Sequence, residues 1–386
     1  MNRRLKMGMV GGSLTSFIGA VHRMASALDN KIELACGAFT ADIEQAALAG
    51  EAYHIDSKRV YGSYQELFEK EKQLPDGERM DFVCIVTPNF LHYPIAKMAL
   101  ENGFHVVCEK PMTITSKEAK NLVELVEESG LLFTLTHPYT AYPLVKQAKF
   151  IVAQGALGKI RKVVVEYPQG WLTTALEKTG HQQASWRTDP KKSGKSGSVG
   201  DIGVHAQQLA EYITGQHISE VCADLTTFVE DRLLEDDANV LIRFDGGAKG
   251  ILYASQVSVG EENNLSIRVY GEKGSLAWKQ QEPNSLVLNL IDKPMQILRA
   301  GDKANLCEEA IKNTRLPMGH PEGLIEAFAN IYSNFADAVN AYNQKSGTDH
   351  SNFDFATVHD GLRGMRFIDA VIESAETNVK WIKIIK

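Results

Sequence analysis

The stretch Phe104-His105-Val106-Val107-Cys108-Glu109-Lys110-Pro111 marks the end of a buried strand in this chain. An apolar run stops abruptly at a charged pair that is followed by proline. Because Pro111 has no N–H and disfavours helix at the residue before it, we expect Lys110 in an extended loop. A lysine at the carboxyl end of a parallel strand lies where open α/β sheets bind ligands. Taken alone, the same residues would also fit a solvent-exposed turn.

Strand-like and helix-like segments alternate on both sides of this stretch, through residues 5–136. Such alternation implies βαβ units with right-handed crossovers, and continuous apolar runs are typical of parallel strands covered on both faces. Residues 1–138 are therefore predicted to form a doubly wound α/β domain. The expected strands are 5–10, 32–39, 82–86, 106–108 and 131–136, and the expected helices are 17–28, 42–49, 64–72, 95–100 and 116–128.

The turn after the first strand is the expected phosphate site, because a helix N-terminus offers free N–H groups and a partial positive charge. It departs from G-x-G-x-x-G, since Ser13 replaces the second glycine. Ser13 and Ser16 are nevertheless small, and their hydroxyls could donate to a phosphate. The position directly after the first strand favours a nucleotide site over a structural turn. The turn reads Gly11-Gly12-Ser13-Leu14-Thr15-Ser16-Phe17-Ile18-Gly19.

The end of the second strand usually carries an acid that binds the ribose of NAD. Here the strand ends at Thr40, and no carboxylate occurs before Asp42. Thr40 could bond a ribose hydroxyl or a 2′-phosphate, and Arg59 could assist binding of the phosphate. The residues alone leave the choice between NAD and NADP open, with NAD slightly favoured.

Residues 139–386 have a different character, with a helix at 143–154 followed by longer strands and hairpin signals such as Asp245-Gly246-Gly247. Strands joined by tight turns are antiparallel, so we expect a large open, mainly antiparallel sheet. Helices at 321–342 and 355–374 are expected to pack back on the first domain, and the tail 381–385 is expected to add an edge strand. The expected strands are 160–167, 221–229, 240–244, 250–258, 265–270 and 275–279.

Asp201 and His205 are the main acid–base candidates in this second region. They are four residues apart, so on a helix they share one face. Asp201 also suits a helix N-cap, and a lone histidine is more often a core residue than a catalyst. Hydride transfer from an alcohol carbon needs a base for the hydroxyl proton and a positive charge for the developing alkoxide. His205 and Lys110 fit these two tasks.

Aromatic and basic residues in the intervening loops could line a substrate pocket. Trp and Tyr rings beside polar groups suit the apolar face of a sugar ring. The histidines and cysteines show no zinc-binding spacing, so no metal is expected. Nor is there a G-x-S-x-G motif for serine hydrolysis. The candidates for the pocket are Tyr139, Trp171, Trp186 and Arg187.

Bulk composition narrows the class of protein. The chain has 386 residues, a net charge of −7 and 44% hydrophobic residues, which indicates two globular domains. The acidic balance argues against nucleic-acid and membrane-surface binding. No apolar run is long enough for a membrane span, and the N-terminus does not resemble a secretory signal. Five cysteines without C-x-x-C spacing suggest a reduced, cytoplasmic protein.

In these combined features the chain resembles the glucose–fructose oxidoreductase/inositol dehydrogenase (Gfo/Idh/MocA) family. The order and spacing of four motifs carry the resemblance across nearly the whole chain. Segments 17–23, 169–172 and 186–190 further resemble a sugar-dehydrogenase subgroup that includes levoglucosan dehydrogenase. The four motifs are the glycine turn, Thr87-Pro88-Asn89 with His92, Glu109-Lys110-Pro111, and Asp201 with His205.

The resemblance implies a Rossmann domain joined to an open-sheet domain over residues 139–386. It also implies NAD(P)-dependent oxidation of a secondary hydroxyl on a sugar, anhydrosugar or cyclitol. Lys110, Asp201 and His205 match the family's catalytic trio, with His205 as proton acceptor. The implied cofactor contacts are Gly11, Gly12, Ser13, Leu14, Ser16, Phe17, Ile18, Thr40, Thr87, Pro88, Asn89, His92, Glu109, Lys110 and Arg187, and the implied substrate contacts are Lys110, Tyr139, Trp171, Arg187, Asp201 and His205.

The mode of cofactor binding, the substrate, the oligomeric state and the function itself each keep further possibilities open. The departures at Ser13 and Thr15 bear on how the cofactor is held, and His137, where many relatives have asparagine, could tune substrate choice. The broad sheet face suggests a homo-oligomer, dimer or tetramer. One alternative is an enzyme that retains its nicotinamide and uses transient oxidation for glycoside cleavage or epimerisation. Another is a non-catalytic NAD-binding sensor, disfavoured because Lys110, Asp201 and His205 are all present.

Overall fold

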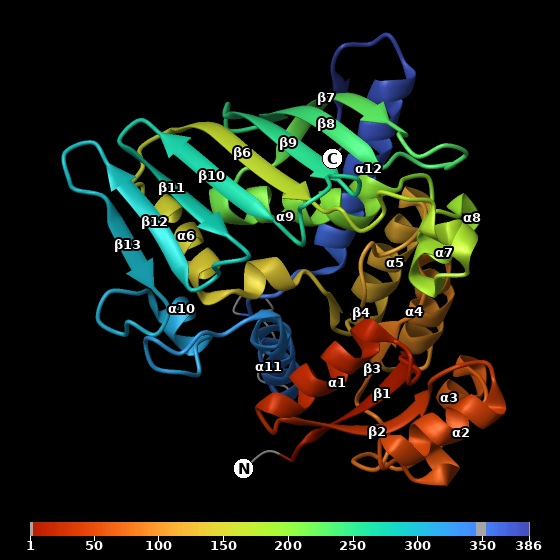
Figure 1. Ribbon diagram of the computed structural model, residues 1–386. Coiled ribbons are helices and arrows are strands. Elements are labelled where there is room, and N and C mark those ends of the chain that lie inside the picture. The colour runs from red at the N-terminus through yellow and green to blue at the C-terminus, as the bar shows by residue number, and fades with distance from the viewer. Residues whose placement is uncertain (1–2, 345–352, 386) are drawn as a thin grey trace. The chain divides into compact units, whose positions relative to one another are not determined.

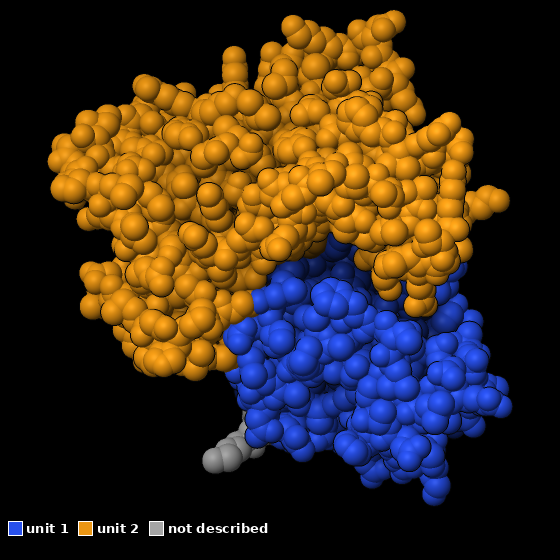
Figure 2. All heavy atoms as spheres, viewed as in Figure 1, with its two compact units in different colours: residues 1–138, 324–362 blue, residues 139–323, 363–386 orange. Residues whose placement is uncertain are grey.

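The computed structural model describes residues 3–344 and 353–385, which divide into two compact units (Figure 2). The first unit comprises Met1–Pro138 and Leu324–Leu362, and the second comprises Tyr139–Gly323 and Arg363–Lys386. The late helix α11 (Leu324–Asn343) therefore belongs to the first unit, although it follows most of the second unit in the sequence.

The first unit contains a five-stranded parallel sheet in the order β2-β1-β3-β4-β5, which confirms the doubly wound class. All residues of β3 and β4 are buried, as their continuous apolar sequence predicts. Its strands are β1 (Leu5–Gly11), β2 (Ile32–Ala38), β3 (Phe82–Val86), β4 (His105–Cys108) and β5 (Phe133–Leu135), and its other helices are α1 (Phe17–Leu28), α2 (Ile43–Ala52), α3 (Tyr64–Glu71), α4 (His92–Glu101) and α5 (Ser116–Ser129).

Helices α1 and α11 lie side by side in this unit (Figure 1), and their apolar faces share one core with the strands. Phe328 and Phe335 of α11 are buried in this core, with Val21 of α1 and Phe82 of β3. The packing places the side chains of α11 against the helix that begins at the glycine turn.

The second unit contains a nine-stranded sheet in the order β13-β12-β11-β10-β6-β9-β8-β7-β14. Helices α6 (Pro143–Ala153) and α9 (Val204–Thr214) cover one face of it (Figure 1). The predicted edge strand in the tail is confirmed, since β14 pairs antiparallel with β7. The strands are β6 (Ile160–Pro168), β7 (Ile218–Thr226), β8 (Asp237–Phe244), β9 (Lys249–Ser255), β10 (Ser266–Gly271), β11 (Gly274–Lys279), β12 (Ser285–Leu290), β13 (Gln296–Arg299) and β14 (Ile382–Lys383).

One pair in this sheet, β6 and β9, is parallel, whereas the other neighbouring strands are antiparallel. Parallel strands need a long crossover connection, and here the crossover carries α7 (Gln182–Arg187), α8 (Pro190–Ser193), α9, β7 and β8. The carboxyl ends of β6 and β9 consequently lie next to each other at the same end of these strands, where Gln169 and Gln256 follow them.

Two further features bear on the class of protein. Within the described ranges, no helix is long and apolar enough to cross a membrane, including α11 and α12 (Val358–Glu376). All five cysteines are free thiols, and four of them are buried.

Candidate active site

The glycine turn after β1 has the backbone that close approach to a ligand requires. Gly11 and Gly12 have φ values of +84° and +78°, which favour glycine. A Cβ on Gly19 would lie 2.5 Å from the Cα of Gly12, so α1 can start against the turn only because residue 19 is glycine. The serine at position 13 therefore leaves the other glycine-dependent contacts of the turn intact.

Ser16 is the N-cap of α1, and its hydroxyl accepts a hydrogen bond from the Gly19 N–H at 3.1 Å. Ser13 lies beside Thr15, with their hydroxyl oxygens 3.4 Å apart. Leu14 and Phe17 are 48% and 68% exposed at this helix start. The structure thus gathers the predicted residues of the turn at the N-terminus of a 12-residue helix, where the backbone favours an anion.

The end of β3 adds a polar atom without a protein partner. Thr87 Oγ1 is buried and makes no hydrogen bond to the described residues. Thr87 also contacts the glycine turn, since its methyl group would lie 3.1 Å from a Cβ on Gly11. A buried hydroxyl normally has a partner. The dinucleotide implied by the fold fits here, because it offers phosphate and ribose oxygens to the turn, Thr87 and the buried Asn89.

Both ring nitrogens of His92 contact backbone carbonyl oxygens. One ring nitrogen lies 2.9 Å from the carbonyl oxygen of Thr87, and the other lies 2.8 Å from that of Pro111. Burial lowers the pKa of His92. Its two contacts join the end of β3 to the turn that follows β4, so His92 fixes the relative position of two predicted cofactor-binding loops.

Glu109 and Lys110 follow β4, and the Lys110–Pro111 peptide bond is cis. The Glu109 carboxylate is buried and accepts hydrogen bonds from His22 at 2.8 Å and Thr136 at 2.5 Å. Burial, with the charge of Lys110 beside it, lowers the pKa of His137 to about 3. The His137 imidazole next to Lys110 is consequently neutral at physiological pH.

At the ribose end of the site, Arg59 already has a protein partner. Its Nε and Nη2 donate to the Glu71 carboxylate at 2.9 and 2.5 Å. Glu71 is fully buried and also accepts from Tyr61, so the arginine neutralises a core carboxylate. Thr40 accepts a hydrogen bond from the Asp42 backbone at 3.4 Å. No motif in the sequence indicates that Glu71 is the partner of Arg59.

In the second unit, Asp201 occupies a π-helical turn, Val199–Gly203, immediately before α9. The expectation that it caps an α-helix is wrong, since Gly203 holds the N-cap position of α9. The buried Glu235 carboxylate anchors the turn by accepting from the backbone N–H groups of Gly197 and Val199. A wider turn changes the angle between residues 201 and 205 from the one assumed for a regular helix.

Gln256 and Arg187 both lie against the Asp201 carboxylate. Gln256, at the end of β9, donates to Oδ2 at 2.8 Å. Arg187 Nε lies 3.3 Å from the same oxygen, in a geometry too bent for a hydrogen bond. The Arg187 guanidinium also stacks on Trp186, 4.2 Å from the ring centroid. Asp201 and Arg187, predicted from widely separated segments, are therefore neighbours.

His205 is the second residue of α9 and is 6% exposed. The Tyr139 ring contacts it edge-on at 4.9 Å between centroids, and Tyr167 lies at 6.3 Å. From these rings a chain of hydrogen bonds leads outward to Trp171. We call it the polar wall, and it runs from Tyr139 to Tyr167, from Tyr167 to Asn263, from Gln169 to Asn263, and from Trp171 to Gln169.

The second unit thus combines a buried imidazole, a held carboxylate and a wall of amide and hydroxyl groups. An imidazole beside a carboxylate can accept a proton, and the wall can bond several hydroxyls of one ligand. Lys110 and the glycine turn belong to the first unit, whereas Tyr139, Trp171, Arg187, Asp201 and His205 belong to the second.

Several residues that hold these sites in place belong to no recognisable sequence motif. Arg23 and Tyr53 both donate to the carbonyl oxygen of Gly12 at 3.0 Å, and these two hydrogen bonds fix the position of the glycine turn. Gln256 and Asn263 lie in loops without a motif. Only their position just after or before a strand of the large sheet could have drawn attention to them.

Comparisons with known proteins agree with this architecture. Residues 5–137 match an oxidoreductase family with an NAD-binding Rossmann fold, and residues 145–277 match the GFO/IDH/MocA C-terminal domain. The chain is 33% identical over 386 residues to the uncharacterized oxidoreductase YfiI of Bacillus subtilis, covering 99% of this chain and 98% of that protein.

A solved structure of an inositol dehydrogenase homolog from Azotobacter vinelandii, complexed with NADH and myo-inositol, is 34% identical, with a TM-score of 0.92 and coverage of 99% and 98% of the two chains. Levoglucosan dehydrogenase of Pseudarthrobacter phenanthrenivorans is more distant, 26% identical over 344 residues and covering 83% and 82% of the two proteins. The subgroup expected from the sequence is thus not the one with the greater similarity. The chain belongs to the Gfo/Idh/MocA family of oxidoreductases, with an NAD-binding Rossmann domain followed by the family's C-terminal domain.

Proposed function

We propose that this protein oxidises a secondary hydroxyl of a cyclitol, sugar or anhydrosugar with NAD⁺. The observation that carries the proposal is the polar wall beside His205. Its two phenols, two amides and one indole N–H are joined to one another, and such a surface is suited to a ring with several hydroxyls. The Azotobacter vinelandii homolog, solved with myo-inositol, supports a cyclitol, and levoglucosan dehydrogenase supports an anhydrosugar.

His205 is assigned the role of proton acceptor for the reacting hydroxyl. Asp201 stabilises the imidazolium that this transfer produces, and Gln256 fixes the Asp201 carboxylate. Lys110 supplies positive charge to the developing alkoxide. The nicotinamide ring, when bound, supplies the hydride acceptor. The neutral imidazole of His137 avoids placing a second positive charge beside Lys110.

NAD rather than NADP follows from the ribose end of the first unit. A 2′-phosphate needs a cation with available donors, and Arg59 has two of its N–H groups on Glu71. We therefore expect NAD⁺ to be preferred over NADP⁺.

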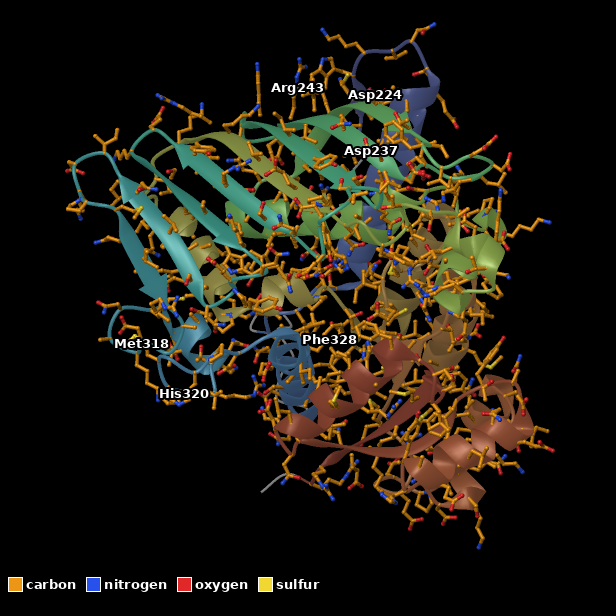
Figure 3. All side chains as sticks on the ribbon, viewed as in Figure 1. Asp224, Asp237, Arg243, Met318, His320 and Phe328 are labelled. Atoms are coloured by element: carbon orange, nitrogen blue, oxygen red, sulfur yellow. The ribbon has the colours of Figure 1, made fainter. Side chains whose placement is uncertain are left out.

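The test combines a panel of substrates with a set of variants. Purified protein is mixed with NAD⁺ or NADP⁺ and a set of cyclitols, pyranoses and anhydrosugars at alkaline pH, and NADH formation is followed by absorbance. We expect turnover with NAD⁺ that falls by at least about a hundredfold in Lys110→Ala and in His205→Asn. His320→Asn is the matched control, because His320 is an exposed histidine of the same unit, labelled in Figure 3.

Each result has a defined meaning. Near-normal turnover in Lys110→Ala or His205→Asn refutes the assigned roles. No turnover with any substrate, together with nicotinamide that stays bound through purification, favours transient oxidation within a closed cycle. No turnover and no cofactor binding indicates that the altered glycine turn, with its departures at Ser13 and Thr15, prevents nucleotide binding.

We also propose that the protein associates through the open face of the large sheet. The exposed Leu241, Ile251 and Ile297 lie on this face. Strand register joins them into a mainly apolar stripe across eight strands, and a large exposed apolar stripe is a typical interface feature. A second copy of the chain is the proposed occupant. In order, the stripe is Cys222, Leu241, Ile251, Val164, Arg268, Ala277, Val287 and Ile297.

Light scattering after size exclusion tests this association. Ile251→Lys places a charge in the centre of the stripe and is expected to lower the measured mass to that of one chain. Ile291→Lys introduces the same change at an 81% exposed position in the turn after β12 and is expected to leave the mass unchanged. A monomeric wild type, or an unchanged mass in Ile251→Lys, refutes the proposal.

A further inference from the structure

We propose that His22 is a positioning residue for Lys110. Paired with Glu109 in the interior of the first unit, it fixes the turn that presents the lysine and joins that turn to α1, the helix that begins at the glycine turn. The inference rests on the proposed function, in which Lys110 acts on the substrate hydroxyl.

The contacts of the Glu109 carboxylate show how the turn is fixed. Oε1 accepts from His22 Nε2 at 2.8 Å and from Thr136 at 2.5 Å, and Oε2 accepts from the Lys110 backbone N–H at 3.3 Å. The Glu109 side chain is therefore held by α1, by the segment after β5 and by the backbone N–H of Lys110. The carboxylate is directed at His22 and Thr136.

The other side of the His22 ring is held as firmly. Its Nδ1 lies 2.6 Å from the Tyr332 hydroxyl and 3.3 Å from Cys84 Sγ. Phe328 of α11, labelled in Figure 3, packs edge-on against the ring with centroids 4.9 Å apart. The ring is fully buried, so its position is determined by β3, α11 and the Glu109 turn together.

The pair is charged at neutral pH. Burial alone would lower the pKa of His22, but Cys84 and Glu109 outweigh it and raise the pKa to about 10. Burial would likewise raise the pKa of Glu109, but the hydrogen bond and charge of His22 lower it below its usual range. His22 thus neutralises the carboxylate that is covalently adjacent to Lys110.

Stability alone is a weak explanation for such a pair. A buried ion pair is often no more stabilising than apolar residues of similar volume. What apolar residues would not provide is a fixed direction for the Glu109 carboxylate and a neutral total charge next to Lys110. We therefore assign the pair to the placement of the lysine.

A double-mutant cycle tests the positioning role. In His22→Gln we expect kcat to fall about 10- to 100-fold while the KM for NAD⁺ changes less than about threefold, because the lysine is displaced but the glycine turn is intact. His22→Gln with Glu109→Gln restores an uncharged pair and is expected to recover most of the loss. Phe328→Leu is the matched control, since it loosens packing around the ring without removing the charge, and it should lower Tm without lowering kcat.

A second readout does not depend on turnover. We expect acylation of Lys110 by a small activated ester to slow about tenfold in His22→Gln and to recover in the double variant. The acylation is done on the folded protein, and the modified lysine is located by mass spectrometry after digestion. The reason is that the ester reacts with the amine in the position that the Glu109 turn gives it, and a displaced turn leaves the amine less accessible to the ester.

The two readouts separate this inference from the proposed function. If the wild type oxidises no polyol, the proposed function fails, and the acylation rates still decide the role of His22. An unchanged acylation rate in His22→Gln overturns the inference. A kcat within threefold of wild type in His22→Gln, or an equal loss of kcat in Phe328→Leu, also overturns it.

Discussion

Replacing Arg232 with methionine should destabilise the second unit and loosen its substrate loop. The Arg232 side chain is 1% exposed, and its guanidinium makes five hydrogen bonds. Two go to the Glu177 carboxylate at 3.0 Å and one to Asp236 at 3.0 Å. The other two go to the backbone carbonyls of Leu172 and Thr174, at 2.9 and 3.1 Å. Arginine has five N–H donors, so this one is fully satisfied.

The magnitude follows from what the change leaves buried. Methionine removes all five bonds, and breaking one side of a buried ion pair costs about 3–5 kcal/mol. Asp236 keeps two backbone donors, the N–H groups of Phe228 and Val229. Glu177 is 14% exposed and can turn toward water. The expected loss therefore lies at the lower end, about 3 kcal/mol, or a fall in Tm on the order of 10 °C.

The assay is thermal unfolding followed by circular dichroism, with Lys178→Met as matched control. Lys178 pairs with Asp231 at 2.8 Å across the same two loops, but the side chains are 56% and 73% exposed. Such a pair should contribute no measurable change in Tm. Equal falls in Tm for the two variants, or a loss below about 1 kcal/mol in Arg232→Met, would refute the reasoning. The KM for the polyol should rise in Arg232→Met only. Arg232 donates to the carbonyl oxygen of Leu172, which directly follows Trp171, a predicted substrate contact.

Three further results are expected. The pKa of His22 is raised from 6.5 to about 10, so its contribution to stability is fully present below pH 6.5 and is lost as the pH rises through about 10. The difference in unfolding free energy between wild type and His22→Gln should therefore shrink between these pH values. A constant difference contradicts the charge assigned to His22. Gly19→Ala places a methyl 2.5 Å from the Gly12 backbone and should weaken NADH binding, measured by fluorescence titration, by at least about tenfold; unaltered affinity would show that the turn can open. Gln256→Leu leaves Asp201 without its 2.8 Å donor and should lower kcat with little change in the Kd for NADH; an equal loss in both would indicate general misfolding.

The Rossmann half of the fold was largely predictable because its signals are local. Helix α1 begins and ends where the sequence indicates, since Ser16 caps it and its apolar face repeats at helical spacing. The buried strands β3 and β4 are continuous apolar runs. In the large sheet, β12 and β13 were not predicted. The residues of β13 are mostly exposed, so the sequence Gln296–Arg299 shows no clear alternation.

The arrangement around the candidate site was less predictable because its partners are distant in the chain. Asp201 lies in a π-helical turn that depends on Glu235, a residue of another loop. The His22 ring binds Glu109 and Tyr332, which are 87 and 310 residues away. Sequence spacing identified the residue types that could do chemistry. It could not show which buried groups hold them.

The parallel pairing of β6 and β9 has a consequence for altering the protein. Both strands end at the same edge, so Gln169 and Trp171 after one strand lie with Gln256 and Asn263 after the other, although a long crossover separates them in sequence. Two short loops therefore carry much of the polar wall, while Asp201 and His205 lie on the π-helical turn and α9, and Gln256 connects Asp201 to the second loop. A library restricted to residues 169–174 and 257–263 would vary the polar wall and leave Gln256, Asp201 and His205 unchanged. Under the proposed function, exchanging these two loops on a constant frame is expected to change which polyol is oxidised.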